Sequence, residues 1–406
     1  MAVGPVALRF TKGMRAMLRD RLSLLDLGQQ CTLLCVGPMS KNCVDVICGL
    51  SHKEDKPMVL IASRRQIDAA ELGGGYVNGW STEEFQDYVR ARARPGRLLL
   101  ARDHGGPWQG APEREYGLSA EQAMEAARRS FKADIESGFE MIHVDTSVDP
   151  KGPPAPDVAL SRLFELYGYC AELALSQGRD IVFEVGTEEQ SHDVSELEQT
   201  RWLLERLLAF CRANRFPTPS FVVAQTGAKV MEMTNVGVMR SLSAVDREYL
   251  RKLEVLVAMC NRQGVYLKGH NADYLSDEVL ALHPRVGIHA INVAPEFGVA
   301  ETRALLRILR NGGLAGLAER FIQLSLASQK WKKWMLPETT ADDTARATIA
   351  GHYVFSTPEF RELKATAVQA LSRRGVDLDA LLRQAIQTQV VRYMAHLNYS
   401  GVALAA

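Results

Sequence analysis

The sequence predicts an α/β fold, a (β/α)8 TIM barrel, from three observations. Short apolar runs of strand length recur along the chain, stretches of helical spacing separate most of them, and each run ends in polar residues or glycine. Because this barrel repeats strand and helix eight times, eight such runs fit it. The runs are Cys31–Ser40, Met58–Ser63, Leu98–Pro107, Met141–Ser147, Ile181–Glu188, Ser220–Gly227, Val265–Ala272 and Ala290–Phe297.

Helices and loops are expected between these runs. Ser81-Thr82-Glu83-Glu84 has the pattern of a capping box and is expected to begin a helix after the second strand. Further helices are expected at Ser119–Ser137, at about 157–177 and at about 194–214. The glycine-rich stretch Leu72–Trp80 is expected to form a mobile loop at the ligand-binding rim.

The helical patterns at both ends divide the chain into three parts. Residues 1–30 are expected to form an N-terminal helical segment, residues 31–314 the barrel and residues 315–406 a helical C-terminal extension. The helix Ala300–Asn311 is expected to close the ring and to end at Gly312-Gly313. The extension is expected to hold three helices, Leu317–Trp334, Pro358–Arg374 and Leu378–Leu397.

Composition and charge narrow the class of protein. The 406 residues carry no formal net charge and are 47% hydrophobic and 24% charged, as in an ordinary globular protein. Nucleic-acid or membrane-surface binding usually needs a basic face, so neither kind of partner is expected. The chain has seven cysteines, an odd number, and no pair of them with metal-ligand spacing has a matching second pair. With no signal-peptide pattern and no apolar run near the ~20 residues that span a bilayer, a cytoplasmic location is expected.

Polar residues at the predicted strand ends form the candidate site. Side chains two apart on a strand share a face, and in a closed barrel these ends converge on one mouth. Imidazoles and carboxylates on separate strands are suited to a divalent metal such as Zn²⁺. His143 is left open between a metal ligand and a core histidine that hydrogen-bonds Asp145. The strand-end residues are Asp103, His104, His143, Asp145, Glu184, Gln225, Lys268, His270 and Asn292.

These residues resemble the class II, metal-dependent ketose-bisphosphate aldolases. The shared segments are Asp103-His104-Gly105, Ile142–Ser147, Glu184-Val185-Gly186, Leu267–His270 and Ala290–Ala294. A closer resemblance is to the accessory, "non-catalytic" subunit of tagatose-bisphosphate aldolase. It rests on Gly-Gly-Tyr at 74–76, Asp-His-x-Gly-Pro at 103–107, Ile-His-x-Asp-x-Ser at 142–147, Gly-Thr-Glu at 186–188 and His-x-x-Asp-Tyr at 270–274.

The resemblance implies roles for individual residues. Asp103 would be the acid/base beside the carbon–carbon bond, with Glu188 and Lys268 as further catalytic residues. His104, Glu184 and His270 would bind the metal, expected to be Zn²⁺. Asn292 would contact the ketose that forms the enediolate, and Gly227 would hold a phosphate. The full set expected to bind substrate is Ser63, Asp145, Gln225, Gly227, Asn271, Asp273 and Asn292.

Two departures from these families matter. Class II aldolases supply a third histidine ligand from the sixth strand, where this chain has Gln225-Thr226-Gly227. Either Glu184 or His143 therefore completes the metal shell, or no catalytic metal is held. Lys268 stands where the accessory family favours an acidic residue.

Three functions are compatible with this pattern. The first is a metal-dependent aldolase-type carbon–carbon lyase or synthase that acts on a phosphorylated sugar through an enediolate. The second is an accessory subunit that stabilises a class II tagatose-bisphosphate aldolase. The third is a Schiff-base aldolase that uses Lys268 with a lowered pKa. A homo-oligomer or a complex with an aldolase subunit is expected. A shared metal requires the His104 and His270 rings to lie within ~8 Å of each other.

Overall fold

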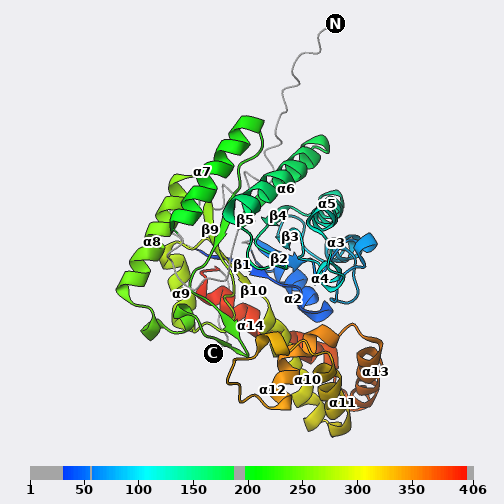
Figure 1. Ribbon diagram of the computed structural model, residues 1–406. Coiled ribbons are helices and arrows are strands. Elements are labelled where there is room, and N and C mark those ends of the chain that lie inside the picture. Colours follow the sequence, from blue (N-terminus) through cyan, green and yellow to red (C-terminus); the bar gives the residue numbers. More distant parts are fainter. Residues whose placement is uncertain (1–30, 55–56, 187–196, 400–406) are drawn as a thin grey trace.

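A computed structural model describes residues 31–54, 57–186 and 197–399 and confirms the (β/α)8 barrel (Figure 1). Its eight parallel strands close in the order β1-β10-β9-β6-β5-β4-β3-β2. The segment 1–30, expected to be helical, lies outside the described residues. The strands are β1 Leu33–Val36, β2 Met58–Ser63, β3 Leu98–Gly105, β4 Met141–Asp145, β5 Val182–Gly186, β6 Phe221–Ala224, β9 Tyr266–Gly269 and β10 Ala290–Val293.

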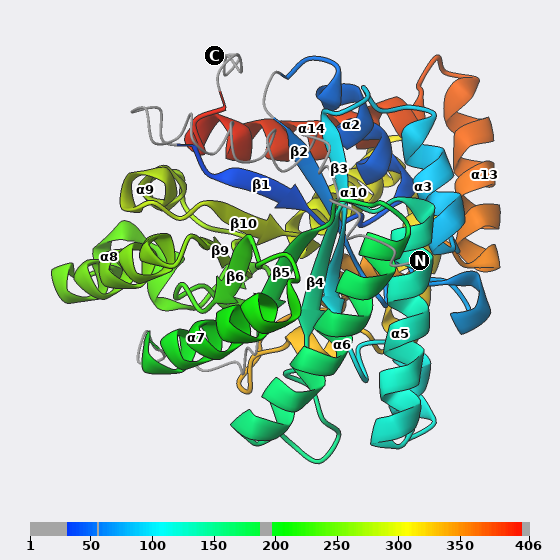
Figure 2. The ribbon, with the colours of Figure 1, turned by 90° about the horizontal axis from the view of Figure 1, so that it is seen from above.

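Helices surround this barrel (Figure 2). Capping boxes begin two of them, at Ser81 with Glu84 as expected and at Ser119 with Gln122. A small hairpin, β7 Val230–Met231 and β8 Thr234–Asn235, follows β6. No helix in the described ranges is both long and apolar enough to cross a membrane. The helices up to β10 are α2 Lys41–Ser51, α3 Thr82–Arg90, α4 Ala111–Glu115, α5 Ala120–Ser137, α6 Pro156–Ser176, α7 Leu197–Asn214, α8 Arg247–Arg262 and α9 Asp277–Val286, with short 3-10 turns η1 Ala70–Leu72, η3 Val238–Arg240 and η4 Leu242–Ala244.

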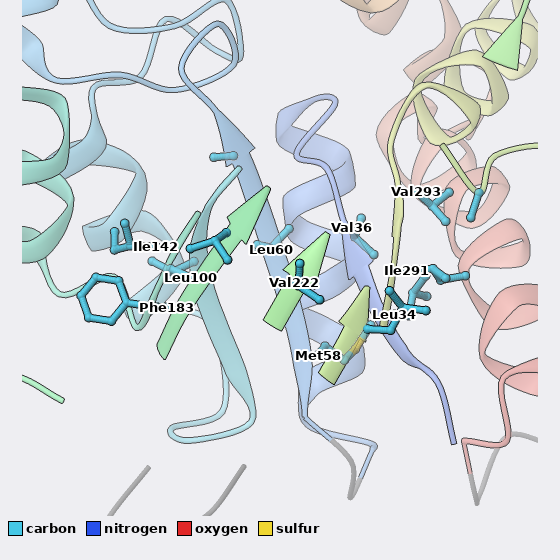
Figure 3. Close-up of a cluster of buried hydrophobic side chains, with 14 of the residues drawn as sticks. Leu34, Val36, Met58, Leu60, Leu100, Ile142, Phe183, Val222, Ile291 and Val293 are labelled. Carbon is cyan, nitrogen blue, oxygen red and sulfur yellow. The ribbon is translucent and has the colours of Figure 1, made fainter. Parts of the chain in front are cut away.

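Strand alternation separates two apolar layers. Outward-facing residues such as Leu60, Phe183 and Ile291 belong to one large cluster with side chains of the surrounding helices (Figure 3). The inner face forms a second cluster that includes Leu99, Met141, Val182, Phe221 and Ala290. Towards the carboxyl ends of the strands, the inward-facing side chains become polar. The barrel interior is thus apolar below and polar at the carboxyl ends of its strands.

The helix that completes the ring is α14 (Leu378–His396), because it packs against α2, α9 and α10. Its Ile386, Val390 and Tyr393 belong to the barrel's hydrophobic cluster. The Thr32 amide donates a hydrogen bond to the Leu397 carbonyl oxygen, and the Leu34 amide donates one to Tyr399 Oη. These bonds tie the residues that follow α14 to β1 and to the residue before it. The structure therefore corrects the expectation that residues 300–311 close the ring.

The helix α10 (Pro295–Asn311) instead leads into a separate lobe below the barrel in Figure 1. Phe297, in its first turn, joins the barrel cluster, whereas Leu305 and Leu309 belong to the hydrophobic cluster of the lobe. Helical spacing alone does not reveal which of two apolar surfaces a helix covers. The other lobe elements are α11 Ala315–Ala327, η5 Lys332–Trp334, α12 Asp343–Ala350, η6 Gly351–Val354 and α13 Pro358–Ser372.

The glycine-rich loop at 72–80 is held against this lobe. The Ser356 hydroxyl donates a hydrogen bond to the Tyr76 carbonyl oxygen at 2.6 Å, and the Tyr76 and Tyr353 rings lie 4.9 Å apart. A Cβ on Gly75 would lie 1.9 Å from the Gln66 carbonyl oxygen, so only glycine fits there. In this structure the loop is anchored by the lobe, in contrast to the mobile loop expected from its glycines.

Replacing Ile386 by alanine should lower the free energy of unfolding by about 2–5 kcal/mol, because it leaves a cavity between α14 and the barrel. Leu381 lies on the same helix and is 39% exposed, so Leu381→Ala is the matched control, with an expected change below about 0.5 kcal/mol. Urea unfolding followed by circular dichroism measures the free energy of unfolding of both variants and of the wild type. Equally small losses would contradict this placement of α14.

Candidate metal centre

Four side chains from four strand ends meet at the barrel mouth. Asp103 lies near the end of β3, His143 lies on β4, Glu184 on β5, and His270 directly follows β9. One potential ligand atom from each lies within 4.8 Å of the others. The β4–β5 register places His143 beside Glu184, and both are buried, as is His270. The structure thus brings together three predicted site residues and adds His143, which the sequence left open.

The donor atoms of this group fit a metal. Glu184 Oε1 is buried, makes no hydrogen bond with any described residue, and lies 3.4 Å from His143 Nδ1 and 3.7 Å from His270 Nε2. Asp103 Oδ1 lies 3.8 Å from each of the same two nitrogens. Such separations suit atoms that share one ion through bonds of ~2 Å, and two imidazoles with two carboxylates suit Zn²⁺.

The charges favour the ligand forms of these side chains. Burial opposes ionisation of Glu184, but Lys268 and the two histidines outweigh it and lower the carboxyl pKa to about 2. The pKa of Asp103 is also held well below its usual range, against burial, chiefly by His104 and His143. Burial lowers the pKa of His270 to about 4. At neutral pH both carboxylates are therefore ionised and His270 is neutral, the forms that bind a cation.

Lys268 neutralises part of this charge. Its Nζ lies 2.7 Å from Glu184 Oε2, and both side chains are almost fully buried, at 1% and 2% exposure. Burial would lower the pKa of the Lys268 ammonium, but the adjacent Glu184 carboxylate raises it above its ordinary value. This shift is opposite to the lowering that the Schiff-base hypothesis expected. Its ion pair makes Lys268 a charge partner of Glu184.

His104 lies beside the four-residue group and outside it. The β3–β4 register shifts between Arg102 and Gly105, and His104 adopts a left-handed backbone with φ 46°. Its Nδ1 lies 2.6 Å from Asp145 Oδ2, which turns that nitrogen towards β4. The ring is nevertheless 4.9 Å from the His270 ring, so the expected proximity is confirmed.

Asp145 fixes this arrangement. Its Oδ2 also accepts a hydrogen bond from Gln109 Nε2 at 2.9 Å, and its Oδ1 accepts bonds from the Ser147 amide and hydroxyl. Burial opposes ionisation, yet the hydrogen bond from His104 lowers the Asp145 pKa to about 2. Asp145, expected to bind substrate, is thus engaged with protein groups and positions His104.

The two glycines after His104 are required by close packing. A Cβ on Gly105 would lie 2.3 Å from Phe131 Cε1, and one on Gly106 would lie 1.8 Å from the Asp145 carbonyl oxygen. Arg64 also reaches this turn, since its Nη1 donates to the Gly106 carbonyl at 2.9 Å. Arg64 was not among the residues predicted to form the site, although its position directly after a predicted strand could have indicated it.

The remaining predicted substrate contacts fall into two groups. Asn292 Nδ2 donates to Asp103 Oδ1 at 3.0 Å, and Ser63 Oγ donates to Gln66 Oε1 at 3.0 Å, so both lie at the mouth. Gln225 follows β6 and is partly buried, and Asn271 is exposed beyond β9. Their substrate contacts stay predictions.

Three other predicted residues have different surroundings. Gly227 has φ 81°, and a Cβ there would lie 2.0 Å from Tyr249 Oη, which explains the glycine without a ligand. Asp273 Oδ1 accepts hydrogen bonds from the amides of Ala294 and Glu296 at 3.0 and 2.8 Å, so it caps the start of α10. Glu188 lies outside the described residues.

Asp273→Asn should change how stability depends on pH. Burial, with Glu296 nearby, raises the Asp273 pKa to about 8, whereas in an unfolded chain the pKa is about 4. The folded state therefore retains a proton that the unfolded state loses, so this contribution to stability is lost as pH rises from about 4 to about 8. Asparagine keeps the oxygen that caps α10 but has no proton to lose. The variant's free energy of unfolding should therefore fall less with rising pH, by at least about 1.4 kcal/mol, which is the free energy of a shift of one pKa unit.

Urea unfolding of wild type and variant at about pH 5 and about pH 8 measures this difference, because groups elsewhere contribute equally to both proteins. An Asp273→Asn protein whose stability falls as steeply as that of the wild type would show that Asp273 is ionised in the folded state.

Comparison with known proteins points to one family. Residues 18–201 match the model of the family described as D-tagatose-1,6-bisphosphate aldolase subunit GatZ/KbaZ-like. The subunit GatZ of that aldolase from Salmonella choleraesuis is 30% identical over 145 residues, 33% of this chain and 32% of the relative. The Klebsiella oxytoca subunit is 35% identical over 126 residues, 28% of each chain. The chain spans about a third of the length of these curated relatives. The predicted resemblance to the accessory-subunit family is confirmed.

Solved structures with the same fold extend over nearly the whole chain. A probable tagatose 6 phosphate kinase from Sinorhizobium meliloti has a TM-score of 0.70 at 18% identity, covering 90% of this chain and all of that one. The fructuronate-tagaturonate epimerase UxaE from Cohnella laeviribosi gives 0.56 at 15% identity, over 97% and 87% of the two chains. A Campylobacter jejuni fructose-bisphosphate aldolase gives 0.53 at 11%, over 95% of each. At these identities the similarity establishes the barrel fold alone.

Proposed function

We propose that this protein is an accessory subunit of a class II tagatose-bisphosphate aldolase and acts in a complex with the catalytic subunit. The observation that carries the proposal is the family match over residues 18–201, which spans β1 to β5 and hence Asp103, His143 and Glu184. The curated relatives are named as subunits of that aldolase. These comparisons favour the accessory role over the independent catalytic aldolase that was our first expectation.

The sixth strand also supports an accessory role. Catalytic class II aldolases supply a histidine there, and this chain has Gln225 at the end of β6. The neighbouring strand β9 places Lys268 opposite Val223 of β6, and the Lys268 ammonium is paired with Glu184. A positive charge in contact with a prospective ligand weakens the attraction of the site for a cation. Gln225 therefore distinguishes the mouth from that of the catalytic relatives, whereas Lys268 departs from the pattern of the accessory family.

A second candidate, a metal-dependent lyase acting on a ketose phosphate, is favoured by the unpartnered Glu184 Oε1 among its buried neighbours. Asp103, His143, Glu184 and His270 would hold the metal. A bound divalent ion would polarise the ketone and stabilise the negative charge that develops as the carbon–carbon bond breaks. Asp103 is ionised at neutral pH, and Asn292 Nδ2 orients it by a hydrogen bond of 3.0 Å. It would therefore accept the proton of the hydroxyl group on the carbon that becomes the aldehyde.

The two candidates differ in what the purified chain does alone. As an accessory subunit it should show no cleavage of tagatose bisphosphate by itself, but should comigrate with a class II catalytic subunit and prolong the half-life of that subunit's activity. Size-exclusion chromatography and a coupled assay for the triose phosphate products measure these effects. The controls are the catalytic subunit alone and its mixture with an unrelated barrel protein.

Chelator-sensitive cleavage by this chain alone would contradict the accessory role and support the second candidate. In that case Asp103→Asn should reduce kcat by about 10²-fold or more, because it removes the proton acceptor. A contaminating aldolase would retain its activity in the same variant preparation. The substitution therefore identifies the protein responsible for the cleavage.

A further inference from the structure

Four basic side chains gather between the barrel mouth and the C-terminal lobe. They are Arg65 after β2, Arg114 on α4, Lys330 just before η5 and Lys333 within η5 in the lobe. None of the four forms an ion pair with a residue in the described parts of the chain. Like charges that lie close together without a counter-ion repel each other, so this cluster needs a structural explanation.

A buried ion pair fixes the barrel half of the cluster. Arg64 Nη2 lies 2.5 Å from Glu113 Oε1, and these side chains are only 1% and 4% exposed. Arg65 and Arg114 each directly follow one member of this pair in the sequence. Arg114 is further held by its Nε, which donates to the Trp108 carbonyl at 2.6 Å. This ion pair holds the loop after β2 against the helix after β3, and the charge of Arg65 acts on Arg114.

Aromatic contacts bring Lys333 from the lobe to the same place. Its Nζ lies 4.6 Å from the centre of the Trp334 ring and 5.3 Å from that of Tyr353. The Tyr353 ring is 4.9 Å from the Tyr76 ring, and the Tyr76 amide donates to the Arg65 carbonyl at 3.0 Å. A short chain of contacts therefore connects Lys333 to the arginines of the barrel.

The electrostatics agree with this geometry. Although Lys333 is exposed, desolvation by neighbouring protein atoms and the charges of Arg65, Lys330 and Arg114 lower its pKa to about 7. Burial and Arg65 also lower the pKa of Arg114. The nearby acids are already engaged, since Glu113 pairs with Arg64 and Asp145 with His104. The cluster is thus strained by repulsion that a bound anion would relieve.

We propose that Arg65, Arg114 and Lys333 form a binding site for a phosphate group at the junction of barrel and lobe. Guanidinium groups match phosphate oxygens through paired N–H donors, and an ammonium adds a compact charge. Asp145, which positions His104, is among the charges that act on Arg114, so the site adjoins the candidate metal centre. Its use for one phosphate of a ketose bisphosphate rests on the proposed function.

Titration calorimetry of the full chain tests the site, first with inorganic phosphate and then with a ketose monophosphate and a ketose bisphosphate. Lys333→Met and Arg65→Met should each weaken binding of inorganic phosphate about tenfold or more. Lys332 lies in the same turn and is exposed like Lys333, but it is not among the charges that act on Lys333, so Lys332→Met is the matched control with unchanged affinity. Equal phosphate affinities in all four proteins would overturn the proposal.

A measurement on the wild type avoids any folding defect in the variants. Amine acylation near pH 7.5, followed by peptide mass spectrometry, should show that inorganic phosphate slows the labelling of Lys333 several-fold and leaves Lys332 unchanged. Absence of protection at Lys333 would overturn the site. A bisphosphate that binds no tighter than inorganic phosphate, with protection intact, would overturn the use of the site for a ketose bisphosphate and leave the phosphate site supported; failure to comigrate with a catalytic subunit is the separate result that would contradict the proposed function.

Discussion

The buried ion pair between Lys268 and Glu184 is the interaction on which the barrel mouth depends. Two carboxylates, Asp103 and Glu184, lie in the polar layer above an apolar interior, where an uncompensated charge costs several kcal/mol. The ammonium of Lys268, 2.7 Å from Glu184 Oε2, offsets one of them. The other carboxylate oxygen of Glu184 stays directed towards His143 and His270. Lys268 thus reduces the negative charge of the layer but leaves Glu184 Oε1 and Asp103 available to a divalent cation.

Much of this architecture could be predicted from the sequence, because apolar runs that end in polar residues define strands and their alternation places Asp103, Glu184 and His270 on one face. The role of His143 could not be decided, since its neighbours depend on the register between β4 and β5. Nor could the helix that completes the ring be predicted: α10 and α14 both carry apolar residues at helical spacing, and only tertiary packing decides that α14 covers the barrel. The raised pKa of Lys268 depends on a partner 84 residues away in the chain.

The C-terminal lobe links the fold to the proposed role. Because α10 leaves the barrel and α14 returns to it, the residues between them form the lobe, which is held against the loop after β2. The glycine-rich loop is anchored there through Tyr76 and Ser356, and Lys333 joins the basic cluster. In the proposed role, this lobe would offer a surface to the partner subunit and would contribute to sugar phosphate binding.

Zinc-edge anomalous diffraction from crystals of the full chain grown with Zn²⁺ tests the central claim most directly, because it locates the ion without reference to activity. The account predicts one peak at the barrel mouth, at ~2.0–2.2 Å from nitrogen atoms of His143 and His270 and from a Glu184 oxygen, with Asp103 beside it. No peak among these side chains, or a peak held only by surface residues elsewhere, would contradict it.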